Sequence, residues 1–131
     1  MFTVFKDYTF AAAHSIRGHQ GECRHLHGHT YRARVHVAAA ELDHLGMVVD
    51  FADLKQMLAE VLGPFDHRVI NEVPPFDERN TTAELIARYA AEEVDRRLVE
   101  RTGGRVRVAR AEVWESDTSC AVYEPPRSAA R

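Results

Sequence analysis

Two alternating segments near the N-terminus constrain the fold of this chain most strongly. Residues 30–39 read TYRARVHVAA, in which apolar residues at odd-numbered positions alternate with polar residues at even-numbered positions up to His36. Successive side chains of a β-strand point to opposite faces, so this pattern predicts a half-buried antiparallel strand. Residues 2–12, FTVFKDYTFAA, are aromatic and partly alternating and predict a preceding strand. A loop rich in glycine and histidine, roughly residues 14–28, would join the two.

Two helices are predicted after these strands. The first covers residues 51–62, where Asp50 stands at the N-cap position, an apolar stripe recurs at helical spacing, and a Gly-Pro pair follows. The second begins near Thr81, because Thr81 and Glu84 have the spacing of a capping box. It should run to about Thr102, before two consecutive glycines.

The last third of the chain predicts two more strands, residues 105–115 and 120–124, around a turn at residues 116–119. The element order strand, strand, helix, helix, strand, strand predicts an α+β fold, a four-stranded antiparallel sheet with two helices on one face. No linker or low-complexity segment interrupts residues 1–131, so we expect one domain. We expect the tail, residues 125–131, to fray.

Composition and charge exclude several classes of protein. The formal net charge of −3 argues against a general nucleic-acid binder, which would carry a basic face. No apolar stretch of about 18 residues predicts a membrane span, and the N-terminus lacks the pattern of a signal peptide. Two cysteines, Cys23 and Cys120, are too few for a disulfide scaffold, so we expect a cytoplasmic protein with free thiols.

Eight histidines are an unusual number for 131 residues, and four of them fall between positions 19 and 29. If a strand begins at or just before His27, its period of two places the rings of His27 and His29 on one face. His14, near the end of the neighbouring predicted strand, is the natural source of a third ligand. Three imidazoles with one open position are typical of a catalytic zinc site. The spacing alone also allows solvated loop histidines, the reading we assign to the remaining ones: His19, His25, His36 and His44.

Two motifs carry a resemblance to a known family. They are Phe10-Ala11-Ala12-Ala13-His14 and Cys23-Arg24-His25-Leu26-His27-Gly28-His29. Together they resemble the 6-pyruvoyl-tetrahydropterin synthase family, including its bacterial 6-carboxytetrahydropterin synthase branch. Further segments agree with that family in the same order, namely residues 49–55, 65–71, 80–84 and 113–116. The resemblance covers nearly the whole chain and implies the tunnelling fold (T-fold).

The resemblance also implies roles for residues of the metal site and of proton transfer. His14, His27 and His29 would hold Zn²⁺. Cys23 would act as the catalytic base, because a nearby dication favours the reactive thiolate; the alternative is a small buried apolar residue. His67 would be a second proton-transfer group, with Asp66 orienting its ring. Without the resemblance, Asp66 and His67 read as a surface loop pair.

Two further residues are implied to bind substrate. Glu115 would accept paired hydrogen bonds from the pterin ring, with Glu112 as the competing candidate on the same strand. Thr82 would add a contact at the start of the second helix, or serve only as its cap. Glu22 stands beside Cys23, and in some relatives a glutamate replaces that cysteine and changes how the side chain is cleaved.

The activity implied is that of a zinc-dependent lyase acting on 7,8-dihydroneopterin triphosphate. In the 6-carboxytetrahydropterin branch the products are 6-carboxytetrahydropterin, acetaldehyde and triphosphate, and the pterin feeds 7-deazapurine (queuosine) synthesis. In the alternative, pyruvoyl branch, the reaction stops after triphosphate is eliminated. Two other classes stay open: a non-catalytic zinc module with Cys23 as a fourth ligand, and a pterin lyase that uses Glu22 and releases a hydroxymethyl product.

The family also implies an assembly. A four-stranded sheet has edges that must be covered or paired. Members of the family join their sheets into a barrel of three subunits and stack two such rings. We therefore expect a homohexamer whose active sites are shared between subunits, with a small-molecule pterin as substrate and neither nucleic acid nor membrane as a partner.

Overall fold

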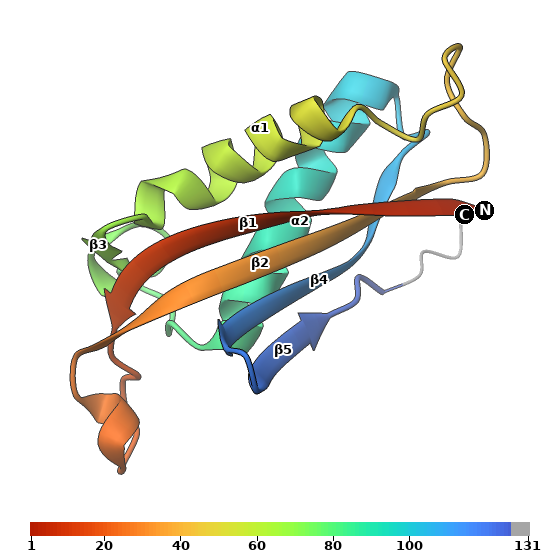
Figure 1. The fold of residues 1–131 in the computed structure, drawn as a ribbon. Helices are drawn as coiled ribbons and strands as arrows, with labels where there is room; N and C mark the ends of the chain where they lie inside the picture. Colours follow the sequence, from red (N-terminus) through yellow and green to blue (C-terminus); the bar gives the residue numbers. More distant parts are fainter. Residues whose placement is uncertain (127–131) are drawn as a thin grey trace.

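The computed structural model describes residues 1–126 (Figure 1); positions 127–131, which hold most of the tail predicted to fray, lie outside the described residues. The strands are β1 (Phe2–His14), β2 (His27–Ala39), β3 (Arg68–Val69), β4 (Arg107–Ser116) and β5 (Ser119–Tyr123). The helices are α1 (Phe51–Leu62) and α2 (Ala83–Thr102). Short 3₁₀ turns are η1 (Glu22–Arg24), η2 (Gly63–Phe65) and η3 (Ile70–Glu72).

The strands form one sheet in the order β3-β1-β2-β4-β5. The pairs β1–β2, β2–β4 and β4–β5 are antiparallel, which confirms the predicted four-stranded antiparallel sheet. The prediction was incomplete at one edge, because β3 adds a fifth strand that pairs in parallel with Ala12 and Ala13 of β1. A strand of two residues is too short to show any alternation in the sequence.

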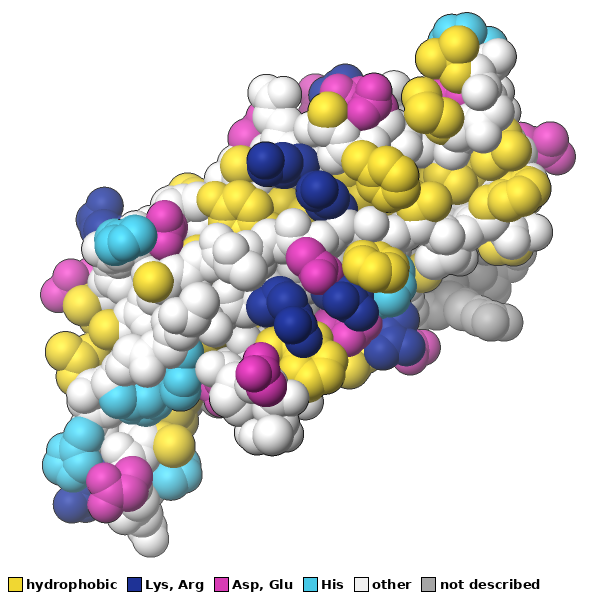
Figure 2. Space-filling view, in the orientation of Figure 1, with side chains coloured by type: hydrophobic (Ala, Val, Ile, Leu, Met, Phe, Trp, Pro, Cys, Tyr) yellow, Lys and Arg dark blue, Asp and Glu magenta, His cyan; other side chains and the backbone are white. Residues whose placement is uncertain are grey.

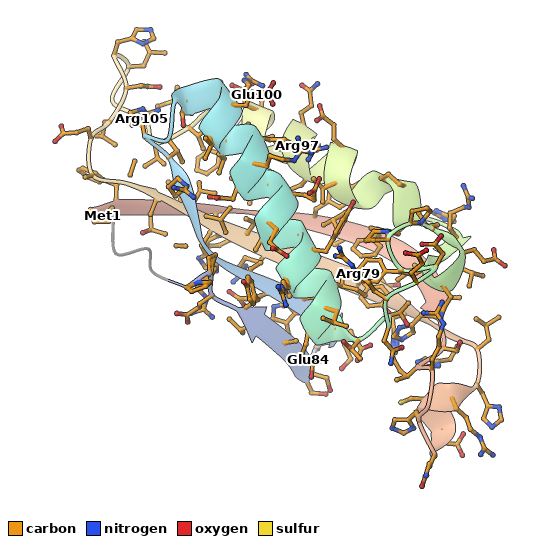
Figure 3. The ribbon with its side chains drawn as sticks, turned by 180° about the vertical axis from the view of Figure 1, so that it is seen from behind. Met1, Arg79, Glu84, Arg97, Glu100 and Arg105 are labelled. Atoms are coloured by element: carbon orange, nitrogen blue, oxygen red, sulfur yellow. The ribbon has the colours of Figure 1, made fainter. Side chains whose placement is uncertain are left out.

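Both helices cover the same face of the sheet, as predicted, and Figure 3 shows them in front of the strands when the molecule is seen from behind. α1 packs against β1, and α2 packs against β4 and β5. The apolar residues of β2 from Tyr31 to Val37 are fully buried under this layer. Small residues such as Ala87 and Ala90 line the buried side of α2 and let its backbone approach the sheet closely. Among the described residues, no helix has the length and apolar character needed to cross a bilayer.

The caps of the helices agree with the sequence except at one residue. The Asp50 carboxylate accepts a hydrogen bond from Ala52 N and begins α1, as predicted. The capping-box spacing of Thr81 was misleading, whereas the reading of Thr82 as the cap is confirmed, since Thr82 is the N-cap of α2 and its hydroxyl accepts from Leu85 N. Thr81 is buried, and its hydroxyl donates to the carbonyl of Ser15. Adjacent threonines therefore have different tasks, one capping the helix and the other holding the chain that leaves β1.

The predicted loop between the first two strands is shorter than the sequence indicated. β1 continues to His14 and β2 begins at His27, so the connection covers residues 15–26. In the antiparallel register His14 lies opposite His27, and Ala12 lies opposite His29. Regular strand geometry, and not a loop conformation, thus places these imidazoles.

The face of the sheet without helices carries charged side chains, seen between hydrophobic ones in Figure 2. Asp7 accepts two hydrogen bonds from Arg34, at 2.7 and 3.0 Å. The Arg34 guanidinium lies 4.1 Å from the ring centre of Phe5, and that of Arg32 lies 4.7 Å from the ring centre of Trp114. Such cation–π contacts let a half-buried sheet surface keep its charges.

Candidate metal centre

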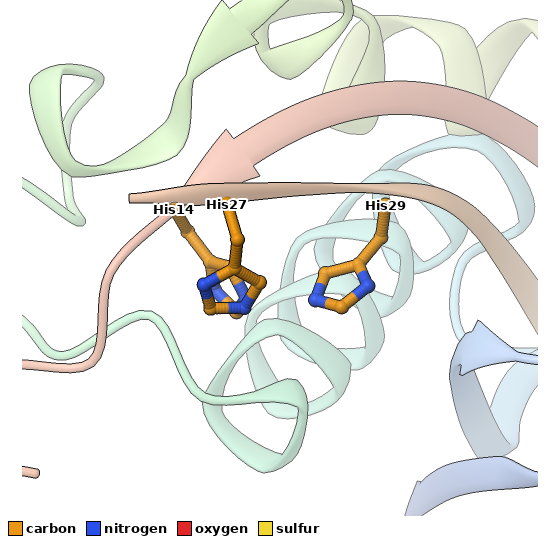
Figure 4. A group of neighbouring side chains, drawn as sticks. All are labelled: His14, His27 and His29. Atoms are coloured by element: carbon orange, nitrogen blue, oxygen red, sulfur yellow. The ribbon is translucent and has the colours of Figure 1, made fainter. Parts of the chain in front are cut away.

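Three imidazoles from two neighbouring strands converge on the helix-covered face of the sheet (Figure 4). His14 ends β1 and is fully buried, whereas His27 and His29 begin β2 and are partly buried. One ring nitrogen from each lies within 4.8 Å of the others, so the group could hold a metal ion. The ring centres are 4.7 to 5.1 Å apart.

Backbone carbonyls fix the orientation of two of these rings. His14 Nδ1 lies 2.8 Å from the carbonyl oxygen of Thr81, and His27 Nδ1 lies 2.8 Å from that of His25. A carbonyl can only accept, so each Nδ1 carries a hydrogen, and in the neutral ring each Nε2 keeps a free lone pair. Metal-binding histidines are commonly held in this way through their second nitrogen.

Two nitrogens of the group have no hydrogen-bond partner. The Nε2 atoms of His14 and His29 are buried and unpartnered among the described residues. A buried polar atom without a partner costs roughly 1–3 kcal/mol, a cost that a metal bond would remove. Burial is also the main cause that lowers the pKa of His29, which favours the neutral form that binds metals. Three neutral imidazole nitrogens suit Zn²⁺, so the residues present fit this ion.

Glu115, near the end of β4, reaches the same group. Its Oε2 lies 3.3 Å from Nε2 of His14 and 3.5 Å from Nε2 of His29. The interaction with His14 is the largest cause that lowers the pKa of Glu115, so the group is a carboxylate at neutral pH. The same residue borders a cavity of about 210 Å³ between the start of α2, where Glu84 lies, and β5. The carboxylate thus stands between the imidazoles and a small cavity.

Glu112, the competing candidate, has a different environment. Its carboxylate pairs with His36 and accepts a hydrogen bond from Nε1 of Trp114 at 3.2 Å. Arg110 approaches it at 3.5 Å. These partners occupy Glu112 away from the imidazole group, which leaves Glu115 as the carboxylate of β4 that faces the site. His36, read from the sequence as solvated, is therefore half-buried and paired.

The sequence reasoning assigned no role to Tyr31, which extends the histidine site along β2. Its ring packs edge-on to those of His14 and His29, with centres 5.7 and 5.3 Å apart, and stacks on Phe10 at 5.0 Å. The Tyr31 hydroxyl is buried and has no hydrogen-bond partner among residues 1–126. Burial and the charge of Glu115 raise the pKa of Tyr31 far above its usual value. Continuing the period of two from His27 and His29 would have reached this residue.

Cys23 lies in η1, within the loop that precedes β2, and its side chain is exposed. The alternative reading as a buried apolar residue is therefore wrong. The loop is held at both ends, since Ile16 N donates to the Cys23 carbonyl at 2.8 Å. Arg17 adds hydrogen bonds to the carbonyls of Phe76 and Arg79 at 2.9 and 2.7 Å. The thiol thus belongs to an anchored surface loop that runs directly into the histidine strand.

Asp66 and His67 form a pair at the outer edge of β1. Asp66 Oδ1 accepts a hydrogen bond from Ala11 N at 2.9 Å and lies 3.0 Å from His67 Nδ1. The bond from Ala11 is the largest cause that lowers the pKa of Asp66. The His67 side chain is 82% exposed, and its backbone has a positive φ of 59°. None of the contacts described within the chain joins this pair to the three clustered imidazoles.

Comparison with known proteins agrees with this geometry. The family model described as 6-pyruvoyl tetrahydropterin synthase matches residues 3–126. A protein of Haemophilus influenzae named 6-carboxy-5,6,7,8-tetrahydropterin synthase is 32% identical, over 95% of this chain and 99% of that protein. One of the same name from Synechocystis sp. is 34% identical, over 97% of this chain and 96% of that protein.

The structure of 6-pyruvoyl tetrahydropterin synthase from Caenorhabditis elegans has the same fold. It superposes with a TM-score of 0.81 and 26% identity, and the match covers 95% of this chain and 96% of that one. The expected tunnelling fold is confirmed by this likeness. The family model covers almost all of the chain, and two relatives exceed 30% identity over nearly their whole length. The chain therefore belongs to the 6-pyruvoyl tetrahydropterin synthase family.

Proposed function

We propose that this protein is a zinc-dependent 6-carboxy-5,6,7,8-tetrahydropterin synthase, with one catalytic domain over residues 1–131. Its substrate would be 7,8-dihydroneopterin triphosphate, and its products 6-carboxytetrahydropterin, acetaldehyde and triphosphate. The observation that carries the proposal is the meeting of His14, His27 and His29, two of which direct into the group buried Nε2 atoms that have no partner within residues 1–126. The names of the two bacterial relatives support the choice of product.

His14, His27 and His29 would hold the zinc ion. A bound zinc supplies Lewis-acid chemistry, which stabilises negative charge that develops on the substrate side chain. Glu115 would orient the pterin, because a carboxylate can accept parallel hydrogen bonds from a ring N–H and the neighbouring exocyclic amine. The cavity beside Glu115 supports this role, and Thr82, the cap of the helix that borders the cavity, would add a contact.

Two groups would transfer protons. The Cys23 thiolate would remove a proton from the substrate side chain, since its loop leads directly to His27. His67 would be the second group, with Asp66 holding its ring and favouring its charged form. Proton shifts along the side chain would precede loss of triphosphate. A retro-aldol-type cleavage would then consume one water molecule, release acetaldehyde and leave the 6-carboxyl group on the pterin.

We further propose that active sites are shared between subunits of a homohexamer, a dimer of trimers. His67 is exposed at the sheet edge and is not joined to the imidazole group of its own chain by the contacts described. The edge of β1 is covered by β3 only at Ala12 and Ala13, and β5 ends the sheet on the other side. Open edges of this kind favour pairing with further copies. A neighbouring copy would then bring its Asp66–His67 pair to the site.

The product would feed 7-deazapurine (queuosine) synthesis, and the free, exposed thiols of Cys23 and Cys120 suit a cytoplasmic location. The test is product analysis. Purified protein with one equivalent of zinc is incubated with 7,8-dihydroneopterin triphosphate, and pterin, triphosphate and acetaldehyde are measured by mass spectrometry. We expect a carboxypterin with acetaldehyde. Absence of any triphosphate release would contradict the proposed activity.

The second candidate is 6-pyruvoyl-tetrahydropterin synthesis, which the name of the matching family model and of the Caenorhabditis elegans structure favours. It starts from the same substrate and would give triphosphate and a pyruvoyl pterin without acetaldehyde. The same assay separates the two reactions. A hydroxymethyl pterin would instead indicate chemistry that depends on Glu22.

A non-catalytic zinc module is the remaining alternative, and the variant Cys23→Ala separates it from an enzyme. If Cys23 is a base, the variant keeps its zinc and loses turnover. If Cys23 is a structural ligand, the variant loses zinc. Cys120→Ala is the control for zinc content alone, because this second exposed thiol lies on β5, outside the imidazole group, and borders the proposed pterin cavity.

A further inference from the structure

A single oxygen of Glu115 contacts two histidines of the proposed metal group at once. Its Oε2 is 3.3 Å from Nε2 of His14 and 3.5 Å from Nε2 of His29. Both nitrogens are buried, and neither forms a hydrogen bond among the described residues. The carboxylate is therefore close to both nitrogens without the geometry of a hydrogen bond to either.

The two distances are longer than a charge-assisted hydrogen bond and suit two ligands of one metal ion. A charge-assisted bond between a ring N–H and a carboxylate spans about 2.7–2.9 Å. Two ligands of one tetrahedral zinc, each about 2.1 Å from the ion, are about 3.4 Å apart. The observed separations of 3.3 and 3.5 Å agree with the second value. The Nδ1–H of His14 is already used by Thr81, so its Nε2 has no hydrogen to donate in the neutral ring.

The pairing of the backbone is irregular at Glu115. The pairing of β4 with β5 shifts register between Trp114 and Ser116, the step that contains Glu115. Bulges of this kind are frequent beside active sites, where they redirect a side chain. Here the side chain lies between the imidazoles and the cavity beside β5. Two positions are thus within its reach, one at the metal and one at the cavity.

We propose that Glu115 is the fourth ligand of the bound metal while the pterin cavity is empty. The inference rests on the proposed metal site and deepens it. Three imidazoles and one carboxylate would then hold the metal, and they would protect it from stray anions and from loss. The same carboxylate then has to leave the metal before it can bind a pterin ring. Substrate entry and opening of the metal site are thereby coupled through one side chain.

Metal binding without substrate tests this proposal. The wild type, Glu115→Gln and Glu115→Asp are loaded with Co²⁺, whose visible spectrum depends on coordination, and Co²⁺ affinity is measured by competition with a chelator. We expect Glu115→Gln to bind Co²⁺ about tenfold or more weakly and to have a changed spectrum. Glu115→Asp keeps the charge but has a shorter reach, so it should also weaken binding.

Glu84→Gln is the matched control, since it removes the same charge from the rim of the same cavity and should bind Co²⁺ as the wild type does. Circular dichroism confirms that each variant is folded. Wild-type affinity and spectrum in Glu115→Gln would overturn this inference and leave the three-histidine site intact. Failure of the wild type to bind one equivalent of Co²⁺ would overturn both the proposed metal site and the inference on Glu115.

Discussion

His14 Nδ1 lies 2.8 Å from the carbonyl oxygen of Thr81, so the last residue of β1 is tied to the residue before the cap of α2. The two residues are 67 positions apart in the chain. This hydrogen bond fixes which nitrogen of His14 carries its hydrogen, and it directs the other nitrogen towards the rings on β2. The packing of helix on sheet and the preparation of the metal site therefore depend on the same contact.

Zinc should stabilise the folded protein through the three imidazoles. At a free zinc concentration about 1,000 times the Kd, the expected gain in the free energy of unfolding is about 4 kcal/mol. In His29→Ala this gain should largely disappear, because the site loses one of three nitrogens. His44→Ala, which changes an exposed histidine of the β2–α1 loop, should keep it. Thermal unfolding of the wild type and of both variants, with and without zinc, measures the stabilisation by zinc. An equal stabilisation in all three proteins would contradict the assignment of His29 as a metal ligand.

Thr82→Ala should destabilise the protein by about 1 kcal/mol through loss of the α2 N-cap. The hydroxyl accepts from Leu85 N and has no part in holding His14, so zinc affinity should stay at the wild-type value. Urea unfolding measures the change in the free energy of unfolding, and competition with a chelator measures the zinc affinity. A large loss of zinc affinity would show that Thr82 acts on the metal site and not only on the helix.

Tyr31→Phe should leave the metal-free protein as stable as the wild type, or slightly more stable. The hydroxyl is buried without a described hydrogen-bond partner, and removing an unpaired buried polar group relieves its desolvation cost of roughly 1–3 kcal/mol. Tyr31→Ala is the contrasting variant, because it also removes a ring stacked on Phe10 and should cost about 3–5 kcal/mol. Denaturant unfolding of the metal-free proteins measures the difference. A marked loss in Tyr31→Phe would mean that the hydroxyl has a partner in solution.

Asp7 should contribute to the acid sensitivity of folding. Its hydrogen bonds with Arg34 are the largest cause that lowers the pKa of Asp7 in the folded state. A carboxyl with a depressed folded-state pKa stabilises the fold above its unfolded pKa of about 4, and this stability is lost as the pH falls through the folded value. The free energy of unfolding should therefore fall less between pH 5 and pH 3 in Asp7→Asn than in the wild type.

The control for this pH dependence is Asp117→Asn, an exposed acidic residue in the turn between β4 and β5. Urea unfolding at several pH values compares the three proteins, and the control should follow the wild-type curve. An Asp7→Asn curve parallel to that of the wild type would show that the pair with Arg34 adds no pH-dependent stability.

Much of the fold follows from local patterns in the sequence. The alternation in β2 predicted its buried side chains correctly, and the apolar stripe of α1 did so except at Phe51, which was counted in the stripe but is 53% exposed. β3 was missed because its two residues are ordered by pairing with β1 and not by any pattern of their own. Thr81 was mistaken for a cap because spacing cannot tell which of two adjacent threonines has extended backbone beside a helix.

The site was predictable to the extent that it follows strand register. His27 and His29 share a face because they are two residues apart, and His14 joins them because β1 and β2 are antiparallel neighbours. The approach of Glu115 to these rings depends on the pairing of β4 with β2, which local spacing in the sequence does not give. The exposure of His67 likewise depends on how β3 meets the edge of β1.

Removal and return of zinc tests the central claim most directly. The protein is stripped with a strong chelator, dialysed, and assayed for triphosphate release from 7,8-dihydroneopterin triphosphate before and after one equivalent of zinc is added. We expect the stripped protein to be inactive and zinc to restore activity to the wild type but not to His29→Ala. Full activity in the stripped wild type, with no zinc detectable by elemental analysis, would contradict a catalytic metal held by His14, His27 and His29.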